Sequence, residues 1–477
     1  MSADARPASD ARHAWSQLAR QDPARRSAPD RIADFLEIYG FYDEVAAREQ
    51  ASRCVQCPEP TCVAGCPLGT NIPEWLALTA EGHFSAAAQA LQAGGNLPEI
   101  CARVCPADHL CEAECVINGQ AQPVSIWAVE QFLNEYAFAH GLVQPDVAPP
   151  NGRHVAVIGA GPGGLACADG LVRRGYAVTI FDHRPQPGGL LVYATPEFHL
   201  QRSIVERRVD LLRRQGVNFR LADAEAEHTP LTLLLEDFDA VYLALGAKQP
   251  RTLDAPGHEL DGVHQAVPFL LQAGTDSAAA KALVGGKHVA VIGGGDTAID
   301  CARAAVRSGA DSVAVVYRRD EASLPAMRRD IDAALEEEVR FLFQAFPISF
   351  IGRPPGVLTG LQLVRTEPGP LGADGRRWFV PTATSFSLVA DVAFLALGFD
   401  PAPLPADSPW QALARTPQGA FQVDARQMTS LPGVFAGGDL VRGPCTALHA
   451  VRDARQAVAG IDAFLATRTD SSEPKER

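Results

Sequence analysis

The chain has 477 residues, of which 47% are hydrophobic and 21% are charged, and its formal net charge is −14. This length indicates about three domains of ~150 residues each, and the composition is typical of a globular protein. The negative charge argues against a nucleic-acid partner, and no segment has the ~18 uninterrupted apolar residues that would span a membrane.

Both ends of the chain are polar. The first residues lack the apolar core of a secretory signal, so the protein is expected in the cytoplasm. Residues 1–30 are expected to form a polar arm, of which residues 1–20 fray. Residues 467–477 are expected to be disordered. Cytoplasmic thiols stay reduced, which argues against a disulfide framework for the eleven cysteines.

Eight of the eleven cysteines lie between Cys54 and Cys115. This part of the sequence has helical patterning, and a helical domain is expected over residues 31–145. A helix pair is predicted over residues 73–91 and another helix over residues 124–138. The other three cysteines stand singly and are expected to be small buried apolar residues; they are Cys167, Cys301 and Cys445.

The eight clustered cysteines form two sets, with the spacings C-x2-C-x4-C-x3-C-P and C-x3-C-P-x4-C-x3-C. Zinc sites usually carry two CxxC pairs, or one pair with two histidines, but this chain has one CxxC and only His109 in the second set. Compact thiol runs that end in Cys-Pro are typical of iron–sulfur clusters. Two [4Fe-4S] clusters are therefore predicted, with zinc as the alternative.

A proline-rich linker is predicted over residues 143–150. After it the sequence HVAVIG occurs twice, beginning at His154 and at His288. Each copy predicts a buried strand that enters a glycine turn and then a helix, which is the dinucleotide-binding pattern. The repeat indicates two nucleotide-binding domains of related architecture, each with a later strand, near Val241 and near Val392.

The first glycine loop contains Gly159, Gly161 and Gly164. It is predicted to bind a pyrophosphate through its tight turn, its exposed backbone and the N-terminus of the following helix. The next strand, over residues 177–182, ends in Asp182, whose carboxylate can accept hydrogen bonds from a ribose diol. The alternative for either loop is an ordinary glycine turn without a ligand.

The second glycine loop is followed by a strand over residues 312–317 that ends in two arginines instead of a carboxylate. A cation cannot accept hydrogen bonds from ribose hydroxyls, but it can pair with a 2′-phosphate. NADPH rather than NADH is therefore predicted here, and the alternative is that the arginines form a solvated face. The residues assigned to this site are Gly293, Gly295, Asp296, Thr297, Arg318 and Arg319.

A third glycine motif, Gly437-Gly438-Asp439, lies downstream of the second loop. It resembles the second FAD-binding motif of flavoproteins with two dinucleotide domains, whose aspartate contacts the ribitol chain. The resemblance implies FAD at the first loop and a helix near Thr446 that points its N-terminus at the flavin.

The fold class is then α/β, with two Rossmann-like domains behind a helical iron–sulfur domain. The FAD-binding domain would comprise residues 151–250 and 398–466, and the NADPH-binding domain, residues 251–397, would be inserted in it.

A disulfide reductase of the same fold would place a cysteine pair beside the flavin. Cys167 and Cys301 have no partner at CxxC or CxxxxC spacing, so this alternative is disfavoured. No catalytic side chain is assigned, because a flavin itself carries the hydride chemistry.

From about residue 30 onward the sequence resembles a family of FAD- and NAD(P)-linked iron–sulfur oxidoreductases. The family includes the small subunit of NADPH-dependent glutamate synthase, the N-terminal half of dihydropyrimidine dehydrogenase and the large subunit of the electron-bifurcating transhydrogenase. The stretches that carry the resemblance are the cysteine sets, both HVAVIG loops, Pro187–Leu200, Tyr317–Arg329 and Gly437–Asp439. The resemblance implies that Gly189, Leu190 and Gly438 also contact FAD.

The resemblance also implies how the cysteines are shared between the clusters. Cluster 1 takes Cys54, Cys57, Cys62 and the distant Cys115, and cluster 2 takes Cys66, Cys105 and Cys111. In relatives an amide or carboxylate on a following helix completes cluster 2, and Glu130 aligns with it. Cys101 is the competing candidate for this fourth position.

The function implied is that of an electron-input subunit, which oxidises NADPH at FAD and passes electrons through the clusters to a partner. The partner expected is the larger, FMN-containing subunit of glutamate synthase, which makes glutamate from glutamine and 2-oxoglutarate. The two subunits would form a hetero-oligomer, and neither nucleic acid nor a membrane is expected as a partner.

The segment Arg442–Ala450 is closer to the pyrimidine-reducing and bifurcating relatives. The NAD(P)H-oxidising subunit of a dihydropyrimidine dehydrogenase or of a bifurcating transhydrogenase is therefore the alternative. An iron–sulfur redox sensor is the alternative of another class, against which the two dinucleotide sites argue.

Overall fold

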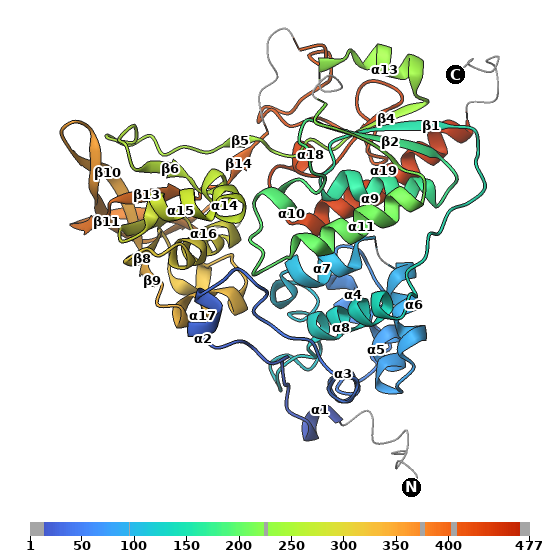
Figure 1. The fold of residues 1–477 in the computed structure, drawn as a ribbon, viewed down its shortest axis with the longest axis horizontal. Helices are drawn as coiled ribbons and strands as arrows, with labels where there is room; N and C mark the ends of the chain where they lie inside the picture. The colour runs from blue at the N-terminus through green and yellow to red at the C-terminus, as the bar shows by residue number, and fades with distance from the viewer. Residues whose placement is uncertain (1–13, 95, 224–227, 373–376, 402–407, 468–477) are drawn as a thin grey trace.

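The computed structural model describes residues 14–94, 96–223, 228–372, 377–401 and 408–467. They form three units, which Figure 1 shows as a helical unit below, a first sheet unit above it and a second sheet unit to the left. Among the described residues, no helix is both long and apolar enough to cross a membrane. The predicted tail, residues 467–477, lies outside the described part except for its first residue.

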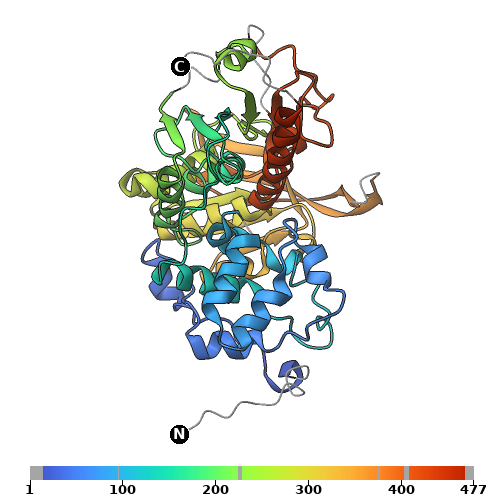
Figure 2. The same ribbon diagram turned by 90° about the vertical axis from the view of Figure 1, so that its right-hand side faces the viewer.

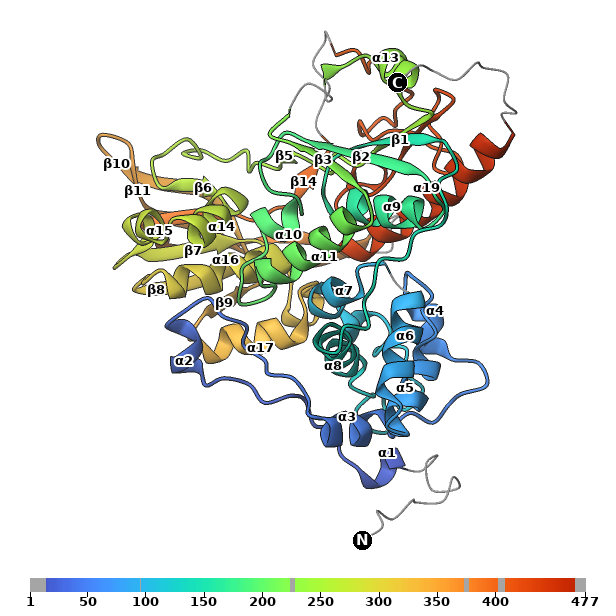
Figure 3. The same cartoon turned by 45° about the vertical axis from the view of Figure 1, so that its right-hand side comes forward.

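The N-terminal segment is packed where it is described. It contains α1 (Ala14–Gln17) and α2 (Ala28–Ile32) and runs along the helical unit to the second sheet unit (Figure 3). Arg20 donates a hydrogen bond to Glu112 of the helical unit at 2.7 Å. The prediction that residues 1–20 fray is therefore wrong for residues 14–20, and residues 1–13 lie outside the described part.

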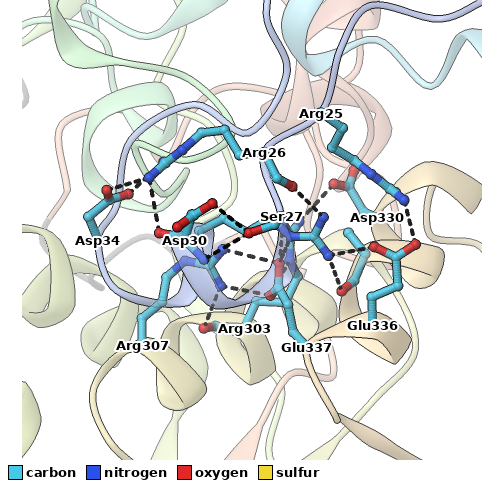
Figure 4. A network of polar contacts seen from close by, with 12 residues as sticks. Arg25, Arg26, Ser27, Asp30, Asp34, Arg303, Arg307, Asp330, Glu336 and Glu337 are labelled. Atoms are coloured by element: carbon cyan, nitrogen blue, oxygen red, sulfur yellow. Dashed lines mark hydrogen bonds and ion pairs between the residues drawn. The ribbon is translucent and has the colours of Figure 1, made fainter.

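Arg31 of α2 fastens this segment to the second sheet unit. Its side chain is 1% exposed and pairs with Glu337, which is fully buried, at 2.8 Å. Figure 4 shows that Arg303 and Arg307 converge on the same carboxylate, at 3.0 and 2.7 Å. Burial would raise the pKa of Glu337, but the hydrogen bonds and charges of Arg307 and Arg303 lower it to about 2.

The helical unit holds the two cysteine sets in its loops and short helices. Its main helices are α3 (Glu44–Ala51), α4 (Thr61–Gly65), α5 (Ile72–Ala80), α6 (Phe84–Gly94), α7 (Pro98–Val104) and α8 (Ile126–Ala139). The helices predicted over residues 73–91 and 124–138 are confirmed as α5 with α6 and as α8. Buried aromatic side chains fill the centre, where the rings of Phe84 and Phe132 meet edge to face, with centroids 5.3 Å apart.

The first sheet unit is a parallel sheet in the order β15-β4-β1-β2-β3. Its strands are β1 (His154–Ile158), β2 (Ala177–Asp182), β3 (Asn218–Leu221), β4 (Ala240–Leu243) and β15 (Val434–Ala436). The helices are α9 (Pro162–Val172), α10 (Leu190–Tyr193), α11 (Arg202–Arg214), α13 (Leu231–Asp237), α18 (Asp439–Arg442) and α19 (Ala447–Ala466). The C-terminal part of the chain thus returns to the first sheet, as predicted.

The second sheet unit repeats this arrangement in the order β6-β13-β7-β8-β9. Its strands are β6 (Val263–Gln265), β7 (His288–Ile292), β8 (Ser312–Tyr317), β9 (Arg340–Phe343) and β13 (Val392–Leu395). Its helices are α14 (Ala266–Thr275), α15 (Ser277–Val284), α16 (Asp296–Arg307) and α17 (Arg328–Glu336). The predicted strands near Val241 and Val392 are confirmed as β4 and β13, each parallel to an HVAVI strand.

An antiparallel sheet extends the second unit, with strands β10 (Ala345–Arg353), β11 (Val357–Leu371) and β12 (Arg377–Val389). Figure 2 shows β11 and β12 projecting from the body of the molecule. The two chain crossings between the sheet units pair with each other as β5 (Gln249–Pro250) and β14 (Phe399–Asp400).

Buried polar contacts hold the units together. Arg208 of α11 and Glu99 of α7 form a bidentate ion pair, in which Nε and one terminal nitrogen of Arg208 each donate to a carboxylate oxygen of Glu99 at 2.7 Å. His199, in the first sheet unit, lies 3.5 Å from Asp300 and 3.8 Å from Asp330 of the second. Burial alone would lower the pKa of His199, but the two carboxylates raise it to about 9, so a charged imidazolium is favoured between the units.

Candidate functional site

The first glycine loop joins β1 to α9 at the carboxyl edge of the first sheet. Gly159 has a φ of +109°, and a Cβ there would lie 2.5 Å from the carbonyl oxygen of Ala244. A Cβ on Gly164 would lie 1.9 Å from the carbonyl oxygen of Gly159, so this glycine lets α9 start directly against the strand. At Gly161 the nearest atom to such a Cβ is 3.9 Å away. The loop therefore has a tight turn, a close packing point and an open backbone between them.

Asp182 ends β2 beside this loop. Its carboxylate accepts hydrogen bonds from the backbone N–H of Ala160 at 2.7 Å and of Arg184 at 2.8 Å. A carboxylate has further lone pairs, so Asp182 can still accept a ribose hydroxyl. Gly189, with a φ of +56°, lies close to the loop, and a Cβ on Gly189 would be 2.8 Å from the Cα of Gly161. Leu190, which is exposed, is the next residue and begins α10.

The third glycine motif follows β15 at the same edge of the sheet. Gly438 has a φ of +70°, and Asp439 opens α18 directly after it. Burial raises the pKa of Asp439 to about 6, and its Oδ1 accepts a hydrogen bond from the N–H of Cys445 at 3.1 Å. The helix predicted near Thr446 is confirmed as α19, whose Ala450 lies 3.3 Å from where a Cβ on Gly438 would be.

Asp453 of α19 is a residue of this site that the sequence did not reveal. It accepts hydrogen bonds from the N–H of Gly438 at 2.9 Å and from Arg442 at 2.7 Å, so it ties the glycine motif to the helix behind it. In the sequence, Asp453 stands out only as an acid on an otherwise apolar face of a predicted helix. That it is fully buried cannot be recognised without the fold.

The second glycine loop has a matching geometry in the second sheet. Gly293 has a φ of +148°, and a Cβ there would lie 2.3 Å from the carbonyl oxygen of Ala396, whereas Gly295 has no atom within 4 Å of such a Cβ. Asp296 and the half-buried Thr297 form the first turn of α16. Burial raises the pKa of Asp296 to about 6, and its Oδ1 accepts from the N–H of Met327 at 3.0 Å.

Arg318 and Arg319 follow β8 at the same edge as this loop. Arg318 is exposed and stacks on Phe379, with 4.7 Å between its guanidinium carbon and the ring centroid. Burial and then the neighbouring charge of Arg319 lower the pKa of Arg318. The Nε of Arg319 is a buried donor without a partner among the described residues. Two adjacent cations, one with an unused donor, fit an anionic ligand such as a phosphate.

Cys54, Cys57, Cys62 and Cys115 line one small cavity, which Cys66 does not line. All four are half-buried. Burial, together with the neighbouring thiols, raises the pKa of Cys54 to about 11 and that of Cys62 to about 12. The structure thus brings together the four cysteines that the family resemblance implies for cluster 1.

A second group of donors lies deeper in the helical unit. Cys101, Cys105 and Cys111 are buried and Cys66 is half-buried. Burial raises the pKa of Cys105 well above its usual value, and the nearby charges of Glu130, Cys101 and Cys66 raise it further. Burial also raises the pKa of Glu130 to about 8. Five donors therefore surround the place implied for cluster 2, one more than a four-iron cluster needs. Both Glu130 and Cys101 thus remain candidates for the fourth position.

The spacing within these groups differs from that of a single-ion site. Among the described residues, no three His, Cys, Asp or Glu side chains converge closely enough to hold one metal ion. Zinc needs sulfur ligands at ≈ 2.3 Å from one point, whereas the ligands of a four-iron cluster each bind a different iron atom and stand farther apart. None of the eleven cysteines, all of them described, forms a disulfide.

The three single cysteines differ from one another. Cys167 and Cys301 are fully buried, as predicted. The same prediction is wrong for Cys445, which is exposed in front of α19, with its Sγ 3.2 Å from Nδ1 of His449. The reason is its place in the turn between α18 and α19, where no element covers it in the described part of the chain.

Two family models match the chain. One, described as dihydropyrimidine dehydrogenase domain II, 4Fe-4S cluster, matches residues 31–142. The other, described as pyridine nucleotide-disulphide oxidoreductase, matches residues 153–454. The solved structure of Mycobacterium tuberculosis FprA in complex with NADPH is similar in fold, with a TM-score of 0.57 at 20% identity, covering 67% of this chain and 85% of that one. Lactococcus lactis thioredoxin reductase has a TM-score of 0.50 at 21% identity, with 66% and 100% covered.

Curated relatives match along almost their whole length. The glutamate synthase [NADPH] small chain of Azospirillum brasilense is 41% identical over 465 residues, which cover 95% of this chain and 96% of the relative. That of Escherichia coli K12 is 38% identical over 472 residues, covering 94% and 98%. The chain is an oxidoreductase with an iron–sulfur domain in front of its nucleotide-binding part, and it belongs to the glutamate synthase small-chain family.

Proposed function

We propose that this chain is the electron-input subunit of a glutamate synthase, which oxidises NADPH and delivers the electrons to a larger, FMN-containing subunit in a cytoplasmic hetero-oligomer. The observation that carries the proposal is the position of α19. Its first turn lies beside Gly438 of the third glycine motif, and Leu448 in that turn packs against Cys101 and Cys105. One helix therefore joins the proposed flavin site to a group of buried thiols.

The proposed cofactor contacts follow from the geometry of the loops. FAD would be held by Gly159, Gly161, Gly164, Asp182, Gly189, Leu190, Gly438 and Asp439, and NADPH by Gly293, Gly295, Asp296, Thr297, Arg318 and Arg319. When bound, a flavin takes up a hydride from NADPH and releases single electrons to iron–sulfur clusters. The corresponding domains would be residues 31–145 for the clusters, residues 151–250 with 398–466 for FAD, and residues 251–397 for NADPH.

The two thiol groups differ in depth, which gives the proposed clusters an order. Cys105 and Cys111 are buried, and Cys105 touches Leu448 of α19. Cys57 is half-buried and lies in the same cavity as Val116, which is 44% exposed. Cluster 2 would therefore lie next to the flavin and cluster 1 nearer the surface, so the face around Val116 is the proposed exit to the partner.

The purified chain, kept anaerobic, tests this function in two steps. NADPH should drive steady reduction of an artificial acceptor by the chain alone, whereas an iron–sulfur redox sensor should show little turnover. Addition of the larger glutamate synthase subunit should then give NADPH-dependent glutamate formation from glutamine and 2-oxoglutarate. Acceptor reduction without glutamate formation would favour a different partner, such as a pyrimidine-reducing subunit.

Arg318→Ala is expected to weaken the preference for NADPH by about tenfold, which corresponds to ~1.4 kcal/mol. The loss should appear in kcat/KM for NADPH and not for NADH, because only NADPH carries the 2′-phosphate. Arg340→Ala is the control, since Arg340 is an exposed arginine that begins β9 at the opposite edge of the sheet. An unchanged ratio of the two kcat/KM values in Arg318→Ala would count against the assignment.

Glu130→Ala is expected to change one of the two cluster signals in the reduced protein and to leave the other as in the wild type. A carboxylate is a hard ligand on a cluster otherwise held by thiolates, so its loss alters the midpoint potential of that cluster. Cys101→Ala is the matched variant, and it should leave both signals unchanged in an EPR-monitored redox titration. If only the cysteine variant disturbs a cluster, Cys101 is the fourth ligand and the assignment to Glu130 is wrong.

A further inference from the structure

Arg455 of α19 reaches out of the first sheet unit into the helical unit. It lies seven residues, or about two helical turns, beyond Leu448. Its Nε donates to the side-chain oxygen of Asn96 at 2.7 Å, and its two terminal nitrogens donate to the carbonyl oxygens of Leu68 at 3.0 Å and of Gly94 at 2.8 Å. Figure 2 shows α19 in dark red, running along the first sheet unit toward the helical unit.

The acceptors of Arg455 belong to the two segments that carry donors of the second thiol group. Leu68 follows Cys66 by two residues and packs against Cys101 and Cys105. The carbonyl oxygen of Asn96 accepts a hydrogen bond from the thiol of Cys101, with 3.9 Å between the oxygen and Sγ. One side chain therefore fixes both segments to the helix that also borders the proposed flavin site.

The charge of Arg455 is not balanced by an ion pair. Within the described part of the chain, no carboxylate lies within ion-pair distance of its guanidinium, and its three hydrogen-bond acceptors are neutral. Asp169, which lies nearby, instead accepts from Asn96 at 2.6 Å and pairs with Arg173 at 3.0 Å. Arg207 and Arg208 of α11, which also cross this boundary, pair with the carboxylates of Glu135 and Glu99. A half-buried cation that lacks such a partner is unusual, because buried charges are normally paired.

The second thiol group offers the missing negative charge. Burial lowers the pKa of Arg455, and the charged forms of Cys101 and Cys66 are the first groups that counteract this. A cluster held by thiolates carries net negative charge, which increases by one when the cluster is reduced. Net charge and hydrogen bonds around a cluster are among the factors that set its potential. A fixed cation at this place therefore favours the reduced form.

We propose that Arg455 is a positioning residue that holds the second thiol group against α19 and whose positive charge raises the midpoint potential of the cluster bound there. This inference rests on the proposed function, which places a [4Fe-4S] cluster at these thiols. It concerns the cluster next to the flavin site and not the one at Cys54, Cys57, Cys62 and Cys115, whose cavity Arg455 does not line.

The test is a redox titration, followed by EPR, of the holoprotein carrying Arg455→Gln or Arg455→Lys, with iron content and thermal unfolding measured on the same samples. Arg455→Gln should lower the midpoint potential of one cluster and leave the other unchanged at wild-type iron content. Arg455→Lys keeps the charge but loses part of the hydrogen bonding, so its potential should stay close to that of the wild type while its unfolding temperature falls. Arg213→Gln, which removes an exposed charge on α11, should shift neither potential.

The outcomes separate this inference from the proposed function. Wild-type protein without two cluster signals would contradict the proposed function itself. Two wild-type signals with an unshifted potential in Arg455→Gln would overturn the role of Arg455 alone. If Arg455→Gln loses iron, the lysine variant decides, because a lowered potential in Arg455→Lys would overturn the role of the charge.

Discussion

Gly164→Ala is expected to abolish the retention of FAD. The new Cβ would lie 1.9 Å from the carbonyl oxygen of Gly159 and 3.2 Å from a methyl carbon of Val157. The first of these is a backbone atom in a tight turn and cannot rotate away, so α9 must move off the strand. The proposed pyrophosphate site lies between this turn and the N-terminus of α9, and such sites depend on that close packing.

The flavin absorbance per chain of the purified variant measures this effect, and we expect a loss of roughly 100-fold or more in affinity for added FAD, about 3 kcal/mol. Gly163→Ala is the matched control, one residue earlier in the same helical turn. Its Cβ would meet Ala450 at 3.6 Å, which is an ordinary contact, and alanine is favoured over glycine in a helix by roughly 0.5–1 kcal/mol. Flavin content in Gly164→Ala equal to that of Gly163→Ala would contradict the role given to Gly164.

The sequence was sufficient for features that depend on local backbone geometry. The glycines of the two HVAVIG loops could be assigned because a tight turn and a close helix packing exclude a Cβ at fixed offsets, and the structure has those exclusions at Gly159, Gly164 and Gly293. The strands could be predicted for a similar reason. A parallel strand covered on both faces is a short, continuous apolar run, and β1 and β7 are buried in this way.

Features that depend on distant contacts could not be read from the sequence. Arg31 and Glu337 are 306 residues apart in the chain, and nothing near either one indicates the other, so the sequence did not predict that the N-terminal segment packs against the second sheet unit. Asp453 and Arg455 lie on one helix with no motif of their own, and their partners come from a glycine turn and from the helical unit. The group of five donors is a further case, because both Cys101 and Glu130 lie close enough to compete for cluster 2.

Arg208→Met is expected to destabilise the protein by about 3–5 kcal/mol, the usual cost of breaking a buried ion pair from one side. Arg208 is 1% exposed and Glu99 is fully buried, and the two hydrogen bonds between them are 2.7 Å long. Methionine fills similar space but leaves the carboxylate of Glu99 buried without a partner. The substitution would also remove the positive charge next to a second buried carboxylate, since Oδ1 of Asp169 lies 4.0 Å from Arg208.

Thermal unfolding followed by circular dichroism should show this loss as a decrease of roughly 5–15 °C in the first transition. The double variant Arg208→Met with Glu99→Met should recover much of it, because a buried ion pair replaced by apolar side chains on both sides is often neutral. Arg213→Met is the surface control, since Arg213 and Asp210 are 49% and 64% exposed and such pairs contribute at most about 1 kcal/mol. A double variant as unstable as Arg208→Met would show that packing at α7 and α11, and not the isolated carboxylate of Glu99, determines the stability of this boundary.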